Sequence, residues 1–137
     1  MVSKWQIIWK PVGNPLETRW KPQETGRGDG KGTTLNRPFA AMSGMTEIGG
    51  AFSNEWTATM ANFKPQLVVI SAGFDSRIDD PLGAFTLTDQ NFATLTQTVI
   101  NVANEHAEGR IISCLEGGYN VSGLASAVQA HIQALRK

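Results

Sequence analysis

From about residue 33 onward, apolar and polar residues alternate in regular patterns that predict secondary structure. Three segments place apolar residues three or four positions apart, the spacing that gives a helix one apolar face. These predicted helices span residues 46–63, 88–107 and 122–137. Thr88 is the expected N-cap of the second helix and Ser122 that of the third. Gly49 and Gly50 weaken the first helix, because glycine is a poor helix former.

Two short apolar runs between these helices predict β-strands. The first lies in "PQLVVISAG", residues 65–73, and the second covers residues 111–115. The first run does not alternate with polar residues, which is typical of a parallel strand covered by helices on both faces. A further short strand is expected in "GTTLNRPF", residues 32–39.

The resulting order of helix, strand, helix, strand, helix predicts an α/β fold, with a parallel sheet flanked by helices on both faces. Two strands make a very small sheet, because the average sheet has about five or six. Either the first third of the chain adds strands that the pattern does not reveal, or the chain is part of a larger structure.

The first 32 residues have a different composition from the rest of the chain. They contain three of the four tryptophans, three prolines and four glycines that alternate with other residues. Proline interrupts helices, and segments rich in glycine and polar residues are typical of loops. We therefore predict no regular structure for residues 10–32.

Charge and length narrow the classes of function. The chain has 137 residues, which fits one domain, and its 12 basic residues match 12 acidic ones. A protein that binds duplex nucleic acid normally carries a basic excess, so we expect no nucleic-acid partner. No apolar run approaches the roughly 20 residues that cross a bilayer, so we expect no membrane partner. A single cysteine and the lack of a convincing signal peptide make the cytoplasm the expected location.

The ends of the two predicted strands carry the candidate functional residues. Active sites of open α/β sheets form beyond the carboxyl ends of the strands. Asp75 follows the first strand and Tyr119 follows the second. Parallel neighbouring strands would bring both residues to one site. Alternatively, Asp75 stabilises a turn through its own backbone and Tyr119 packs over a strand end.

Other residues capable of chemistry have structural explanations. His106 lies at the polar end of a predicted helix and is expected on the surface. His131 lies near the apolar side of the last helix and is expected to be packed or half exposed. Cys114 lies within an apolar strand, where a cysteine usually behaves as a small, buried apolar residue.

Three segments, read together, resemble a known family: "ETGRGDGKGTTLNRPF", "FKPQLVVISAGFDSRIDDPLG" and "GRIISCLEGGYNVSGLASAV". They are similar to the C-terminal half of the histone deacetylase superfamily, particularly its class II and bacterial acetylpolyamine and acetoin-utilisation members. The resemblance covers residues 24–137. We therefore expect a C-terminal portion of a deacetylase-like domain there, preceded by an unmatched segment at residues 1–23.

The resemblance implies a partial arginase/deacetylase-type fold and a zinc-dependent amidohydrolase that acts on acetylated lysine or small acetylated amines. Asp75, in Gly-Phe-Asp, matches a zinc-binding aspartate of the family. Tyr119, in Gly-Gly-Tyr, matches the tyrosine that hydrogen-bonds the substrate carbonyl. Leu82, in Asp-Pro-Leu-Gly, matches an apolar residue at the rim of the acyl-lysine tunnel, and Gly117 and Gly118 match the turn that aims the tyrosine. A carboxylate is an ordinary zinc ligand, and a phenol can stabilise a forming oxyanion.

The sequence also departs from the family. A catalytic zinc site needs three protein ligands, and the family takes the other two from Asp-x-His and its general base from His-His. Neither motif occurs in this sequence. We therefore expect a truncated chain that does not hold Zn²⁺ firmly and has no deacetylase activity alone. Three interpretations stay open: a half-enzyme completed by a partner chain or by self-association, a non-catalytic binding module, and a small-ligand domain without metal. The substrate and the survival of the family's K⁺ site stay undetermined.

Overall fold

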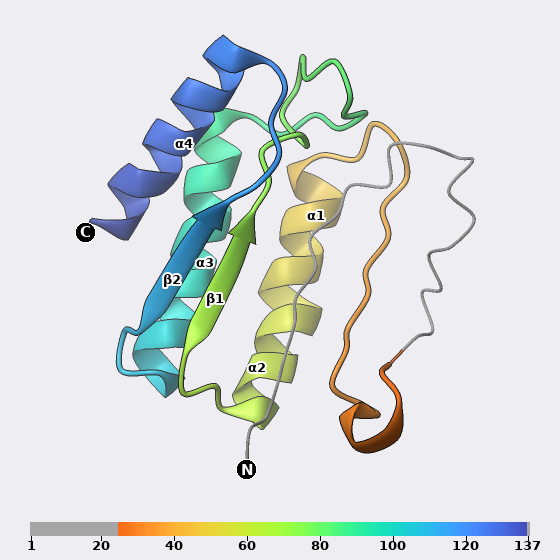
Figure 1. Cartoon of the computed structure of the whole chain (residues 1–137), viewed down its shortest axis with the longest axis vertical. Helices are drawn as coiled ribbons and strands as arrows, with labels where there is room; N and C mark the ends of the chain where they lie inside the picture. The colour runs from red at the N-terminus through yellow and green to blue at the C-terminus, as the bar shows by residue number, and fades with distance from the viewer. Residues whose placement is uncertain (1–24, 137) are drawn as a thin grey trace.

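The computed structural model describes residues 25–136 of the chain (Figure 1). The predicted unmatched segment, residues 1–23, lies outside this range. Within residues 25–32, a single 3₁₀ turn, Gly28–Gly30, interrupts an otherwise irregular course, in keeping with the predicted loop. The remaining elements, in chain order, are α1 (Met45–Ala51), the π-helical segment η2 (Phe52–Trp56), α2 (Thr57–Phe63), β1 (Val68–Ala72), α3 (Asp89–His106), β2 (Ile111–Leu115) and α4 (Val121–Leu135).

The two predicted strands form a parallel pair. Val68 lies opposite Ile111, and the register continues without interruption to Ala72 opposite Leu115. The prediction of an α/β fold with a parallel sheet flanked by helices is confirmed. The strand expected in residues 32–39 is wrong, because this segment carries no regular structure. Its Pro38 cannot donate a ladder hydrogen bond, which disfavours a strand there.

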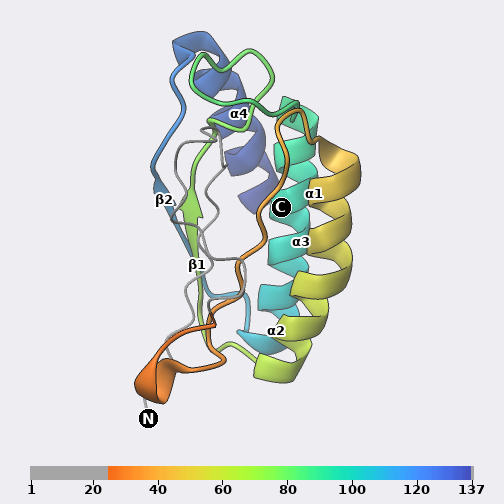
Figure 2. The ribbon, with the colours of Figure 1, turned by 90° about the vertical axis from the view of Figure 1, so that its right-hand side faces the viewer.

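Helices α1, α2, α3 and α4 all lie on one side of the sheet (Figure 2). The other side exposes Val69 and Ile112, whose exposed fractions are 53% and 50%. Within residues 25–136, the expected cover on both faces is therefore not present. Cys114 is exposed as well, so its expected burial was wrong. An apolar run indicates that both faces of a strand are suited to burial. It does not establish that helices of the same segment cover both faces.

Side chains from the helix-facing side of β1 join two apolar clusters. Ala72 packs in the first cluster and Val68 in the second, while Ile70 and Phe52 contact both. The first cluster lies toward the carboxyl end of β1 and contains Ile48, Phe74, Phe85, Leu87, Phe92, Leu95 and Ala127. The second contains Trp56, Met60, Val99, Val102, Ala103 and Ala107.

The helix ends follow local hydrogen-bonding rules. The predicted cap Thr88 is confirmed: its Oγ1 accepts from the backbone N–H of Asn91 at 3.3 Å, and the Asn91 side chain accepts from the backbone N–H of Thr88 at 2.9 Å. The predicted cap Ser122 is wrong. Asn120 caps α4 instead, because its Oδ1 accepts from the N–H of Gly123 at 3.0 Å, while the Ser122 hydroxyl only donates to that oxygen. None of the described helices is long and apolar enough to cross a bilayer.

Candidate active site

The carboxyl ends of β1 and β2 bring two loops into contact. The backbone N–H of Glu116 donates to the Ala72 carbonyl at 3.0 Å, and that of Phe74 donates to the Gly117 carbonyl at 2.8 Å. The loops that follow, residues 73–88 and 116–120, leave the same end of the sheet (Figure 1). The structure therefore brings together the two segments in which the sequence placed Asp75 and Tyr119.

The Asp75 carboxylate lies against glycines from both loops. A Cβ placed on Gly117 would lie 3.0 Å from Asp75 Oδ2, and one placed on Gly73 would lie 3.3 Å from Oδ1. Real Cβ atoms rarely come so close to a neighbouring atom, so the missing side chains of these glycines make room for the carboxylate. The sequence analysis linked Gly117 only to the orientation of Tyr119. In the structure Gly117 also makes room for the Asp75 carboxylate.

Asp80 ties the two loops to each other. It is buried, and its Oδ1 accepts from the backbone N–H groups of Leu82 and Gly83 at 2.9 and 3.0 Å. Its Oδ2 accepts from the N–H of Tyr119 at 2.7 Å and from that of Asn120 at 3.4 Å. One carboxylate thus fixes the backbone at both Leu82 and Tyr119.

The electrostatics of Asp80 follow from these contacts. Burial by itself raises the pKa of this carboxyl group. The four backbone N–H donors stabilise the charged form and outweigh burial, so the pKa of Asp80 is lowered from its ordinary value. Asp80 is consequently an anion that holds the loops, and not a proton donor at neutral pH.

The sequence analysis missed Asp80. Its Asp-Pro sequence was a usable signal, because an aspartate before a proline often accepts backbone N–H bonds in a turn. The bond to Tyr119 joins residues that are 39 positions apart, and no local pattern predicts it.

Tyr119 and Leu82 point toward solvent from a fixed backbone. Their exposed fractions are 54% and 67%. Gly118, just before Tyr119, has a φ of +139°, and a Cβ there would lie 2.6 Å from Leu124 Cδ1. Only glycine adopts this φ without strain, and any other residue would also displace the Leu124 side chain. The phenol and the leucine side chain are thus presented at the surface beside the Asp75 loop.

Arg77 connects the same loop to the first turn of α3. Its Nε donates to Asp89 Oδ1 at 2.7 Å, and its Nη1 contacts the Asp79 carboxylate and the Ile78 carbonyl. The hydrogen bond from Arg77 is the main reason why the pKa of Asp89 is lowered. The sequence alone did not predict the bond between Asp89 and Arg77, which are 12 positions apart.

The histidines do not reach these loops. His131 is buried between α3 and the sheet, where Nδ1 lies 2.7 Å from Thr96 Oγ1 and Nε2 lies 2.8 Å from Ser113 Oγ. His106 ends α3, five residues before β2 begins, and is therefore at the opposite end of the sheet from Asp75. Its side chain is only 12% exposed, so its expected surface position was wrong.

The described residues do not complete a zinc site. Zn²⁺ at a catalytic site takes three protein ligands, and residues 25–136 contain no group of three or more His, Cys, Asp or Glu side chains that could hold a metal ion. Asp75 is a suitable single oxygen ligand. By themselves, residues 25–136 therefore do not form a complete Zn²⁺ site.

The chain is similar to one family of known proteins both in sequence and in structure. The sequence model of the histone deacetylase domain matches residues 15–135. Histone deacetylase 6 of Caenorhabditis elegans is 37% identical over 127 residues, which are 92% of this chain and 12% of that protein. Polyamine deacetylase HDAC10 of Homo sapiens is 40% identical over 111 residues, which are 80% of this chain and 16% of that protein.

Solved structures agree with these sequence matches. The HDA15 HD domain has a TM-score of 0.81 and 29% identity, over 90% of this chain and 34% of the solved one. The histone deacetylase Clr3 has a TM-score of 0.75 and 34% identity, over 81% of this chain and 18% of the solved one. The chain spans about a third or less of the proteins that it matches here.

Proposed function

This chain belongs to the histone deacetylase family, and on that premise we propose that its loops 73–83 and 116–120 form one part of a deacetylase-type amidohydrolase site. The observation that carries the proposal is the link between the two loops: Asp75 lies against Gly117, and Asp80 holds the backbone of Tyr119. Both candidate residues thus occupy fixed positions at one end of the sheet.

Each residue has a proposed role that its surroundings support. Tyr119 donates its phenolic hydrogen to the carbonyl oxygen of the substrate amide, and the hydrogen bond from its N–H to Asp80 holds its backbone in place. Leu82 offers an exposed apolar surface at the entrance, where it contacts the carbon chain of the substrate. Asp75 is a metal ligand that acts only together with ligands from outside residues 25–136.

The proposed substrates are acetylated lysine and small acetylated amines. The names of the relatives, a histone deacetylase and a polyamine deacetylase, support this range. An amide of this kind offers a carbonyl oxygen to the Tyr119 hydroxyl and an aliphatic chain to Leu82. The described part of the chain has no further contacts that distinguish one of these amines from another.

We also propose that these 137 residues alone do not deacetylate, and that Zn²⁺ and further residues from outside this sequence must complete the site. The sequence contains only two histidines, and one of them is buried in the core with both ring nitrogens engaged. Neither an Asp-x-His zinc motif nor a His-His pair can be formed from them. The missing ligands and the base must therefore come from residues outside this sequence, on the same or on another polypeptide.

The test is a deacetylase assay on an acetyl-lysine peptide and on an acetylated polyamine. The pure chain is compared with the chain mixed with Zn²⁺ and the separately expressed part of the HDA15 HD domain that this chain does not match. We expect no turnover by the pure chain and turnover by the mixture. Tyr119→Phe and Asp75→Ala should abolish that turnover, whereas Gln133→Ala, an exposed change on α4, should not.

Two results would contradict the proposal. Turnover by the pure chain that is lost in Tyr119→Phe would show that the chain completes its own site. A stable mixed complex with no turnover would show that these loops do not serve a deacetylase. A Zn²⁺ titration of the pure chain gives an independent check. We expect the unchanged chain and Asp75→Ala to give the same titration, because Asp75 alone does not hold the ion.

A further inference from the structure

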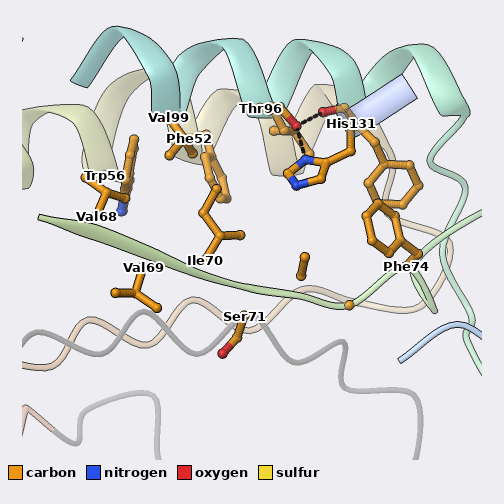
Figure 3. Close-up of a pocket in the computed structure, with 14 residues that line it drawn as sticks. Phe52, Trp56, Val68, Val69, Ile70, Ser71, Phe74, Thr96, Val99 and His131 are labelled. Atoms are coloured by element: carbon orange, nitrogen blue, oxygen red, sulfur yellow. Dashed lines mark hydrogen bonds between the residues drawn. The ribbon is translucent and has the colours of Figure 1, made fainter. Parts of the chain in front are cut away.

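His131, on α4, places its imidazole where three elements meet. The residue is 6% exposed, and Figure 3 shows its hydrogen bond to Thr96 and its place beside Phe74. Nδ1 lies 2.7 Å from Thr96 Oγ1 on α3, and Nε2 lies 2.8 Å from Ser113 Oγ on β2. The ring centroids of His131 and Phe74 are 5.7 Å apart, at an interplanar angle of 69°. The ring nitrogens do not reach the loops of the candidate site, so the Phe74 ring is the link between His131 and these loops.

Phe74 supports both loops. It is 3% exposed and directly precedes Asp75. Its backbone N–H donates to the Gly117 carbonyl at 2.8 Å, and a Cβ placed on Gly118 would lie 3.4 Å from the Phe74 Cβ. The turn that leads to Tyr119 therefore packs directly against Phe74. A displacement of Phe74 would move Asp75, to which it is bonded, and the turn before Tyr119, which it contacts.

The Phe74 ring contacts two other rings, and one of them can change its charge. The Phe92 ring on α3 lies 5.0 Å away between centroids, and the His131 ring lies 5.7 Å away. Aromatic contacts of this kind depend on the relative orientation of the rings. Because protein interiors are close-packed, a movement of the imidazole is passed to the ring beside it. His131 is therefore a support of Phe74 whose position depends on its protonation.

A proton on His131 would not meet a countercharge. The titratable side chains nearest in the chain to its neighbours are Asp89, Glu105 and His106 on α3, Cys114 on β2, Arg136 after α4 and Asp75 beside Phe74. Within residues 25–136, burial alone accounts for the lowered pKa of His131, and none of these groups contributes to it. A charged imidazole that stayed in place would be buried and unpaired, which is unfavourable. The ring must therefore move when it is protonated.

We propose that His131 is a positioning residue for the candidate site: through Phe74, the protonation state of its imidazole determines the positions of Asp75 and Tyr119. The neutral ring, hydrogen-bonded to α3 and β2, keeps Phe74 under the turn before Tyr119. The charged ring leaves this place, and Phe74 moves with both loops. That these loops serve a deacetylase rests on the proposed function, whereas the coupling between His131 and the loops does not.

The test is a pH titration of the isotope-labelled full chain, followed by NMR from about pH 8 to about pH 5. This range includes the ordinary pKa of histidine and stops above the usual titration of carboxyl groups. We expect the backbone amides of Asp75, Gly118 and Tyr119 to shift with the same midpoint as the ring protons of His131, below the ordinary value of 6.5. The amides of α2 should not shift. A role limited to stability would leave the loop amides of the folded chain unchanged.

Two substitutions test whether the coupling runs from His131 through Phe74. His131→Gln keeps a side chain that can hydrogen-bond both hydroxyl groups but does not titrate, so the loop amides should keep their neutral-form positions throughout the range. Phe74→Leu removes the ring, so the imidazole should still titrate while the amides of Gly118 and Tyr119 no longer follow. His106→Gln is the matched control, at the other end of α3 from the loops, and should leave the titration unchanged.

A comparison at about pH 8 covers the case in which the buried ring stays neutral over the whole range. His131→Ala removes the contact with Phe74, so the amides of Gly118 and Tyr119 should be displaced, and His131→Gln should displace them less. In a Phe74→Leu chain, His131→Ala should displace them no further, because coupled residues are not additive.

The deacetylase assay adds a kinetic measurement if the mixture described above is active. Tyr119 acts on the substrate carbonyl in the transition state, so its displacement affects kcat more than KM. His131→Ala should lower kcat about tenfold and leave KM within about twofold of the unchanged value, and His131→Gln should recover most of the loss.

Four results would overturn the proposal: a His131 ring that titrates while the loop amides stay in place, loop amides that still follow the ring in Phe74→Leu, unchanged loop amides in His131→Ala, or a change of all amides together, which would be unfolding. The NMR measurements need neither metal nor substrate and are independent of the deacetylase assay. Coupled movement in a chain that is inactive in every mixture would uphold the role of His131 and reject the proposed function.

Discussion

The loop end of the sheet and the open edge of β1 differ in how completely the chain satisfies its own polar groups. At the loop end, one buried carboxylate accepts four backbone N–H bonds and Arg77 joins two further acidic residues. Along the open edge, within residues 25–136, the backbone of Val69 and Ser71 and the indole of Trp56 have no such partners. The difference teaches that the positions of the candidate site residues are fixed inside this chain, while the described residues leave one edge of its sheet unpaired.

This comparison predicts that changes at the loop end cost far more stability than changes at the open edge. The largest effect is expected for Gly83→Ala. A Cβ at this position would lie 1.6 Å from the Asp75 carbonyl oxygen, which belongs to the backbone and cannot move without rebuilding the loop. We expect a loss of about 3–4 kcal/mol in the free energy of unfolding, measured with urea and circular dichroism.

Gly50→Ala is the matched control for that substitution. Gly50 lies in α1, and a Cβ there would meet nothing within 4 Å. Alanine is the better helix former, so the free energy of unfolding should rise by about 0.5–1 kcal/mol. Equal losses in the two variants would show that the loop end is no more constrained than the helix.

The second prediction removes the carboxylate that links the loops. Asp80→Ala leaves the N–H groups of Leu82, Gly83 and Tyr119 without their acceptor, and we expect a loss of about 3 kcal/mol. Asp80→Asn keeps one acceptor oxygen and should lose less. If urea unfolding shows both variants to be as stable as the unchanged chain, the proposed link between the loops is wrong.

The pH dependence of the Asp80 effect has a defined sign. The pKa of Asp80 is lowered in the folded chain, so its contribution to the free energy of unfolding is present above the unfolded pKa of about 3.9. It is lost as the pH falls through the folded value. The difference in stability between Asp80→Asn and the unchanged chain should therefore shrink below about pH 4.

Much of the fold could be predicted from the sequence because its patterns are local. The apolar spacing of residues 88–107 and the capping sequence at Thr88 each depend on neighbours within one or two helical turns. The placement of Asp75 and Tyr119 followed from the rule that parallel strands end at one edge. Both residues do lie on adjoining loops, but their chemical roles stay predictions.

What the sequence could not predict depends on contacts between distant segments. The bond of Asp80 to Tyr119 and the exposure of Cys114 are of this kind. The cap of α4 is different, since Asn120 and Ser122 are both good capping residues two positions apart. Local preference does not choose between them, and the geometry of the preceding turn, held by Asp80, favours Asn120.

The third prediction concerns His131, which is buried between α3 and the sheet. Thr96 Oγ1 donates to the Phe92 carbonyl at 2.6 Å, so it accepts from His131 Nδ1, and His131 Nε2 lies 2.8 Å from Ser113 Oγ. Both ring nitrogens are therefore engaged in hydrogen bonds. Burial lowers the pKa of His131 in the folded chain, because the charged form is poorly solvated there.

The direction of this pH dependence follows from whether the folded or the unfolded chain is protonated first. Above about pH 6.5, the ordinary pKa of histidine, both states carry a neutral His131 and the stability does not depend on it. Below that pH the unfolded chain is protonated first, so the free energy of unfolding falls until the folded pKa is passed. Urea unfolding at a series of pH values should show this decline, and His131→Gln should remove it. His106→Gln, at the other histidine, should leave the decline in place.

The smallest effect on stability is expected for a substitution of Val69, on the open face of the sheet. Val69→Thr changes a residue that is 53% exposed, whereas Val68→Ala removes methyl groups from a residue that is 7% exposed and packed in the core. We expect less than about 0.5 kcal/mol for the first and about 2 kcal/mol for the second, at any protein concentration. If Val69→Thr costs as much as Val68→Ala, and more so at high concentration, then copies of the chain cover this face in solution. The open face would then be an interface already in use, and its exposure would belong to the single chain and not to the protein as it exists in solution.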